Sequence, residues 1–233
     1  MSWEEKTDYC GLEADGVLRC FDAKDGKGGT FLEKTGKDGA FAASKLFGVV
    51  AAPSCEYKIL ARATLDAVKL GAVTEAGGKK FALESISYTA TAGGEPSFSA
   101  SAKQVEDAAT GETCNTFAVP AFTVDKDEVA HEIFEGAFTL TGAGCELTTC
   151  AAEISCTVSP HAVNGYPVAS DVTGGHVVLT LTIGQYGDAE PTVAPGEGWD
   201  LSAPLSSSDP DSDFPTWTCA LTKALAKTVA AAG

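Results

Sequence analysis

Basic residues are scarce in this chain of 233 residues, and they are scattered. Lys and Arg number 16 against 32 Asp and Glu, which gives a formal net charge of -16, and Lys79-Lys80 is the one adjacent basic pair. Binding of nucleic acid depends on clustered Lys and Arg that neutralise phosphates. The sequence therefore argues against direct binding of nucleic acid. An acidic wall could instead line a passage through which DNA slides without adhering.

The sequence also lacks the common catalytic and nucleotide-binding signatures. It contains no G-x-S-x-G elbow of a serine hydrolase, and Gly77-Gly78-Lys79-Lys80 lacks the earlier glycine and the Ser or Thr of a phosphate-binding loop. The few histidines show no ligand spacing on one element, and they are His131, His161 and His176. These absences together favour a protein that is not an enzyme, with no catalytic or cofactor-binding residue and no cofactor.

Two groups of residues are candidate metal ligands. Cys145, Cys150 and Cys156 lie close in the sequence, but no C-x-x-C pair of a zinc site is present, and an alternating apolar pattern favours structural thiols. Asp209, Asp211 and Asp213 alternate as in part of a calcium loop, yet Phe214 and Ala220 replace the required glycine and glutamate. We expect a solvated acidic turn and no metal site, and calcium binding at this turn stays open.

We expect no export signal, since Met1-Ser2-Trp3-Glu4-Glu5-Lys6 has neither a basic start nor an apolar run. The apolar stretch from Leu46 to Pro53 is too short to span a bilayer. We expect synthesis in the cytoplasm of the producing cell, no membrane contact, and free thiols at the eight cysteines.

Composition divides the chain near residue 50. Residues 1–50 are rich in glycine and polar turns, and they predict an irregular N-terminal arm or subdomain that orders against neighbouring subunits. Residues 51–233 predict a β-rich domain. Their hydrophobic positions recur with period two, which is typical of half-buried strands.

Several strands and one helix follow from this pattern. The expected strands cover Cys55–Ala67, Phe81–Ala90, Phe98–Val105, Cys150–Val158, Val177–Ile183 and Thr216–Thr222, with a turn at Gly93-Gly94 and a further strand at Tyr166–Val172 after Asn164-Gly165. Acidic residues beside Lys126 and the spacing of Val129 and Ile133 predict a helix over 126–135. The predicted fold is all-β, a β-sandwich or incomplete barrel with one flanking α-helix and an extended N-terminal arm.

The layout from Cys55 to Thr222 resembles virion structural proteins of tailed bacteriophages, in particular the tail-tube (major tail protein) class. The segments that carry the resemblance are Gly142 to Cys150, Asp171 to Leu181 and Pro195 to Leu201. It implies subunits that pair sheet edges around a ring, typically of six, with rings stacked by loops and an N-terminal arm. Self-association, contact with other virion proteins, location in the virion and an acidic, DNA-conducting lumen are the corresponding expectations.

The same resemblance points to particular segments, because it implies assembly and no catalysis. Ring contacts are expected along Phe98–Val105 and Val177–Ile183, and stacking contacts in the arm before Leu46. Other readings of the acidic, β-rich profile are a capsid-decorating or tail-completion protein, a carbohydrate-binding or adhesive β-sandwich, and a metal-dependent hydrolase on a β scaffold.

Overall fold

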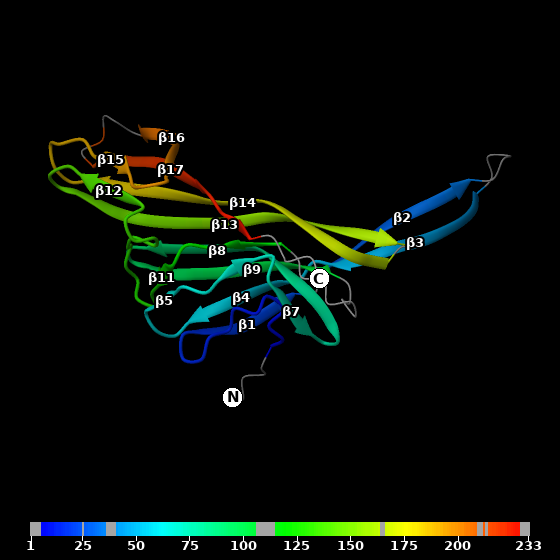
Figure 1. Ribbon diagram of the computed structural model, residues 1–233. Helices are drawn as coiled ribbons and strands as arrows, with labels where there is room; N and C mark the ends of the chain where they lie inside the picture. The colour runs from blue at the N-terminus through cyan, green and yellow to red at the C-terminus, as the bar shows by residue number, and fades with distance from the viewer. Residues whose placement is uncertain are drawn as a thin grey trace.

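The computed structural model is built from antiparallel β-strands (Figure 1). It describes residues 6–24, 26–35, 41–105, 115–163, 166–208, 212 and 214–228, and for 27–35, 41–50, 160–163 and 166–170 it describes the backbone alone. No helix among these residues has the length and apolarity needed to cross a membrane.

One large antiparallel sheet organises the chain. Its strands lie in the order β1-β4-β9-β8-β13-β14-β17-β16, with β7 paired to one end of β8. Their bounds are β1 Leu18–Lys24, β4 Ser54–Ile59, β7 Val73–Ala76, β8 Lys79–Thr91, β9 Gly94–Val105, β13 Cys145–Val163, β14 Tyr166–Gln185, β16 Asp200–Ser207 and β17 Thr216–Ala224.

Four smaller pairings complete the structure. They are β18-β10-β6, β11-β5, β12-β15 and β2-β3. The bounds are β2 Lys27–Thr35, β3 Phe41–Ala51, β5 Ala63–Leu65, β6 Lys69–Leu70, β10 Thr116–Ala118, β11 Phe122–Val124, β12 Phe138–Thr141, β15 Thr192–Pro195 and β18 Lys227–Thr228.

The large sheet buries one of its faces, because its strands place an apolar residue at every second position. The central strands contribute fully buried side chains to this face: Ile86 and Tyr88 from β8, Cys150 and Ile154 from β13, Leu179 and Leu181 from β14, and Leu221 from β17. Small sheets and loops supply the covering layer. The result is a sandwich-like arrangement with a single hydrophobic core.

A chain of aromatic rings ties the covering layer to the sheet. Phe98 of β9 stacks on Phe122 of β11 with ring centroids 6.4 Å apart, and Phe122 meets Phe134 at 5.9 Å. Phe134 in turn lies 5.3 Å from Trp199. Such ring pairs add roughly 0.5–1.5 kcal/mol each beyond the area they bury, so they fix the two layers in register.

The helix predicted over 126–135 is wrong, because this segment forms turns and bends. Its backbone groups bond to other segments: Gly93 donates to the carbonyl of Glu128, and Thr123 donates to the carbonyl of Ile133. Ile133 is buried while Val129 is 46% exposed, so the expected apolar stripe is not a single face. A helix of this length is marginal alone, and tertiary pairing replaces it.

The hairpin predicted from Gly93-Gly94 is confirmed, since β8 pairs with β9 down to Thr91 opposite Gly94. The strand predicted at Thr216–Thr222 is also confirmed as β17. Two other predictions change. The run expected from Cys55 to Ala67 breaks into β4 and β5, and Tyr166–Val172 is no separate strand but the start of β14, which pairs with β13 along its length.

Residues 1–50 contribute buried side chains to the core and most of a two-stranded ribbon, formed by β2 and β3. Cys10, Leu18 and Cys20 are buried in the common core, and β1 is an edge strand of the large sheet. β2 and β3 pair only with each other and extend away from the body (Figure 1). The division of the chain at residue 50 stays a prediction.

Ile154 of β13 gives a test of the core. Replacing it by Ala should lower the free energy of unfolding by about 2–5 kcal/mol, because a fully buried side chain leaves a cavity in a packed interior. Glu153→Ala on the same strand is the matched control, since Glu153 is exposed, and it should change stability by less than about 0.5 kcal/mol. Urea denaturation measures both; equal effects would contradict the assigned strand facing.

Candidate assembly surfaces

The first candidate surface is the ribbon of β2 and β3, called here the N-terminal ribbon. β1 pairs with β4, and the same two chain segments then continue as β2 and β3, which pair from Lys27 opposite Ala51 to Thr35 opposite Phe41. Gly26 lies at the junction, where the Ala52 N–H donates to its carbonyl. A side chain at this position would collide with the Ala52 carbonyl, so glycine permits the close approach.

The second candidate surface is the far end of the β13–β14 hairpin, called here the central ribbon. β8 pairs with β13 only between Thr149 and Ser155, and β17 pairs with β14 only from His176 onward. Beyond these points, the two strands pair with each other as far as Val163 opposite Tyr166. The ribbons project from the same end of the body (Figure 1).

A bulge marks the place where the central ribbon leaves the sheet. Ser155 is opposite His176 and Thr157 is opposite Thr173, so Gly174 and Gly175 together oppose Cys156. Gly174 has φ of 69°, which favours glycine. An added Cβ at Gly175 would collide with the Phe117 ring. Bulges bend a strand and strengthen its twist, so these glycines direct the ribbon.

The two strands expected to form ring contacts have neighbours within the subunit. Val177–Ile183 of β14 is paired on both sides, with β13 and β17. Phe98–Val105 of β9 is paired with β8 throughout, but with β4 only from Phe98 to Ser101. Ring contacts along these strands stay a prediction. The outermost strands of the sheet are β1 and β16. β16 carries Pro204 and two register shifts, features that blunt an edge against pairing.

The face of the large sheet opposite the core is lined by small polar side chains. Ser85 and Ser101 share a hydrogen bond of 2.7 Å across β8 and β9. Ser87, Glu153 and Thr180 are exposed on the central strands. This Ser/Thr-rich surface offers hydroxyl groups for hydrogen bonds, beside the carboxylate of Glu153.

A groove of about 1120 Å³ crosses the edge formed by β1, β4 and β9. Its lining includes Phe21, Leu60 and charged residues of both signs from β4 and the 126–128 loop. Phe21 is 46% exposed and occupies a register shift between Cys20 and Asp22. This arrangement suits a polar ligand with one apolar face, or a chain that lies along the edge.

The three histidines lie on different elements: His131 in a loop, His161 in β13 and His176 in β14. His131 lies near the Tyr88 hydroxyl and the Thr123 carbonyl, at 3.4 and 3.2 Å from Nε2, and so supports the loop that replaces the predicted helix. His176 contacts the Gly174 carbonyl at 2.9 Å through Nδ1. His161 lies in β13, in the part where the backbone alone is described. The acidic turn Asp209, Asp211 and Asp213 lies outside the described residues.

The side chains of Cys145, Cys150 and Cys156, the three candidate metal ligands, do not form a cluster. Cys150 and Cys156 are buried on one face of β13, and burial raises the pKa of each thiol to about 12. Cys145 begins the same strand and donates to the Ala189 carbonyl at 3.2 Å. All seven cysteines within the described residues are free thiols. The interpretation of Cys150 and Cys156 as apolar packing groups agrees with this geometry.

The structure brings together a further cluster of ligand-type side chains, which the sequence did not predict. Asp8, Cys10 and Cys55 bring one ligand-type atom each within 4.8 Å of the others. The Cys10 thiol hydrogen-bonds to Cys55, which lowers the pKa of Cys55 to about 6 and raises that of Cys10. Burial, then the charge of Cys55, raises the pKa of Cys20 to about 12. No local motif marks this cluster, because a loop and a strand distant in sequence supply it.

Comparison with models of known protein families finds no match, and comparison with curated proteins finds none either.

Gly175 gives a test of the bend in the central ribbon. Gly175→Ala should destabilise the fold by about 1–3 kcal/mol, because the new methyl group must displace the Phe117 ring in a packed contact. Gly94→Ala is the control, since its Cβ would meet only the Thr91 side chain, at 3.4 Å or more. Thermal unfolding should show a lower midpoint for the first variant only. The same midpoint in both variants would mean that the Phe117 contact does not hold the bend.

Proposed function

We propose that this protein is a structural subunit of a bacteriophage virion that assembles with copies of itself into stacked rings of a tail tube. The observation that carries the proposal is the pair of projecting two-stranded ribbons. In each of them the described strands pair with each other, and no further described strand pairs with their outer edges. No catalytic step is assigned.

Unpaired ribbon edges favour association for a physical reason. An isolated two-stranded ribbon is at best marginally stable in water, and its free N–H and C=O groups are a template for another strand. Addition of a strand from a neighbouring subunit satisfies those groups along the whole ribbon. A closed ring removes every such edge at once, which is the simplest symmetric solution.

The two ribbons offer complementary edges in one region. The Ala51 N–H at the end of β3 donates to the Gln104 side chain of β9 at 3.3 Å, which anchors the N-terminal ribbon beside the sheet. The central ribbon leaves the sheet at Gly174-Gly175 at the same end of the body (Figure 1). In a ring, the N-terminal ribbon of one subunit would lie against the central ribbon of the next.

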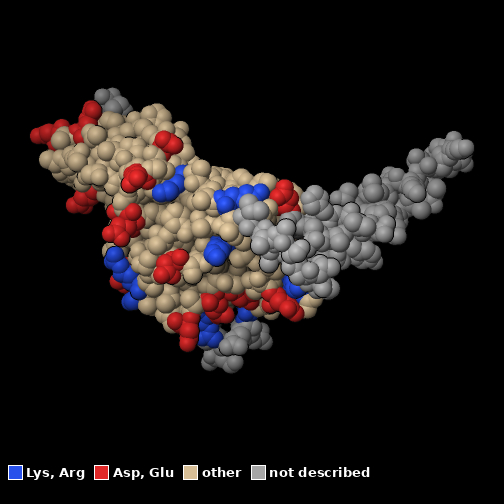
Figure 2. Space-filling model, viewed as in Figure 1, with Lys and Arg blue, Asp and Glu red and all other residues tan. Residues whose placement is uncertain are grey.

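The net negative charge of the chain supports the proposal that the tube has a DNA-conducting lumen. A net charge of -16 repels DNA, and acidic side chains are spread over the visible face (Figure 2). Repulsion at the wall keeps a polyanion hydrated and lets it slide. The Ser/Thr-rich face of the sheet, which also carries Glu153, suits contact between subunits or rings.

Removal of the N-terminal ribbon tests the proposal. Lys24 lies directly opposite Ser54 in the β1–β4 pair, so residues 25–53 can be replaced by Asn-Gly, a preferred two-residue hairpin turn. This keeps β1 and the buried Cys10, Leu18 and Cys20, which deletion of everything before Leu46 would remove. We expect a folded monomer that forms no rings or tubes in negative-stain electron microscopy and analytical ultracentrifugation.

The matched control changes a turn that the proposal does not use. Ala92→Asn places Asn-Gly at the tip of the β8–β9 hairpin, where Gly93 already has φ of 70°. This variant should assemble like the unchanged chain. Tubes formed by the ribbon-deleted protein would contradict the assigned role, and a monodisperse monomer from the unchanged chain at high concentration would contradict the tube itself.

The groove beside β1 supports a second candidate, a carbohydrate-binding β-sandwich. Sugar sites combine an aromatic platform with polar side chains, and Phe21 lies among Glu56, Lys58 and Ser97. On this reading, retention on immobilised polysaccharides should fall at least tenfold in Phe21→Ala. Phe214→Ala changes an aromatic outside the groove that is more exposed than Phe21, and it should have no effect. Absence of retention by the unchanged protein removes this candidate.

A further inference from the structure

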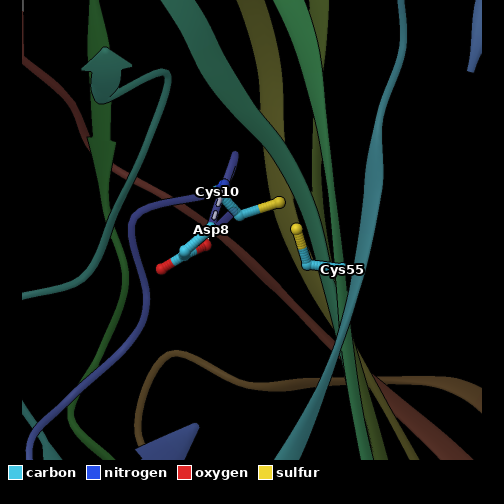
Figure 3. A group of neighbouring side chains, drawn as sticks. All are labelled: Asp8, Cys10 and Cys55. Carbon is cyan, nitrogen blue, oxygen red and sulfur yellow. Dashed lines mark hydrogen bonds between the residues drawn. The ribbon is translucent and has the colours of Figure 1, made fainter. Parts of the chain in front are cut away.

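The cluster of Asp8, Cys10 and Cys55 joins the N-terminal loop to the large sheet. Figure 3 shows the two sulfur atoms directed toward each other, with the Asp8 carboxylate beside Cys10. Cys10 is 3% exposed, Cys55 is fully buried, and Asp8 is partly buried. Their ligand-type atoms lie within 4.8 Å of one another. Ligands of one tetrahedral ion are typically about 3–4 Å apart, so this spacing fits a shared ion.

A further thiol lies next to the cluster. Cys20 of β1 is 3% exposed, and Cys55 contributes, after burial, to the raised pKa of its thiol. The Cys20 thiol donates to the Asp22 carbonyl at 3.7 Å. The cluster itself therefore supplies two sulfurs and one carboxylate oxygen, with Cys20 as a neighbouring thiol. Thiolate sulfur and carboxylate oxygen are ligand types of tetrahedral zinc sites.

The Asp8 carboxylate is held rigidly, as a ligand in a built site must be. Its Oδ1 accepts from the backbone N–H of Cys10 at 3.0 Å and of Gly11 at 2.9 Å, and also from the Tyr57 hydroxyl. Its Oδ2 accepts one bond, from the N–H of Glu13 at 2.8 Å. Oδ2 thus keeps a free lone pair, and the bonds to Oδ1 form the outer shell that orients ligating carboxylates.

We propose that Asp8, Cys10 and Cys55 bind one thiophilic divalent cation of the zinc class, and that the neighbouring Cys20 thiol or a water molecule completes the coordination. Soft thiolates select zinc over magnesium or calcium, which prefer oxygen alone. Binding releases the protons of the Cys10 and Cys55 thiols to solvent, and the divalent cation offsets the charges of these two thiolates. The ion would clamp the N-terminal loop onto β4. The site forms within one subunit, whether or not the protein assembles.

Metal analysis of the purified, reduced protein tests the site. The chain is loaded with Zn²⁺ or Co²⁺ and passed through a desalting column. We expect one equivalent of bound metal, and for Co²⁺ the visible bands of a tetrahedral ion together with thiolate charge transfer in the near ultraviolet. Zn²⁺ should raise the midpoint of thermal unfolding, and a chelator should reverse the rise.

Variants separate this site from the other thiols. Cys55→Ser should abolish the charge-transfer band, whereas Cys219→Ser, a buried thiol of β17 outside the cluster, should retain the full equivalent. Tyr57→Phe removes only the hydroxyl that holds Asp8, and it should weaken the metal affinity about 10–100-fold while leaving the fold intact. Far-ultraviolet circular dichroism checks the fold of each variant.

Two results would overturn the proposal without any variant. The first is metal content in the unchanged, reduced protein no greater than in Cys55→Ser. The second is a Cys10–Cys55 disulfide in the protein isolated without reductant, seen as a cross-linked peptide pair in mass spectrometry, together with no metal uptake after reduction.

Discussion

The antiparallel pairing of β13 with β14 is the interaction on which the rest of this structure depends. The two strands pair from Cys145 opposite Gln185 to Val163 opposite Tyr166, and they form the centre of the large sheet. β8 adds to one side and β17 to the other, each over only part of that length. The core and the projecting ribbon are therefore two parts of one hairpin, so a change in its register would alter both.

Beyond Ser155 and before His176, no further described strand pairs with β13 or β14. The N-terminal ribbon repeats this situation, because β2 and β3 pair with each other and with no other described strand. The outermost strand β16 is irregular and contains Pro204. Protection of one edge and exposure of the ribbons are what a subunit needs if it joins its neighbours in a fixed direction.

The N-terminal loop depends on polar and sulfur contacts as well as burial. Asp8 organises the loop through three backbone N–H groups, and Cys10 carries it to β4. β1 is an edge strand that begins the N-terminal ribbon, so whatever holds β1 to β4 also sets the base from which the ribbon projects. A bound cation at Asp8, Cys10 and Cys55 would link the stability of this base to metal supply.

The sequence by itself determined several strands after residue 50 and which of their faces are buried, as in Cys150 to Val158 and Val177 to Ile183, because alternation of apolar and polar residues is a local property. Only the tertiary structure decided the rest. The segment 126–135 forms no helix because the N–H groups of Gly93 and Thr123 bond to its carbonyls. β9 and β14 each have paired strands on both sides. The Cys10 and Cys55 side chains lie close together. Each of these outcomes depends on partners distant in the chain, which no local pattern encodes.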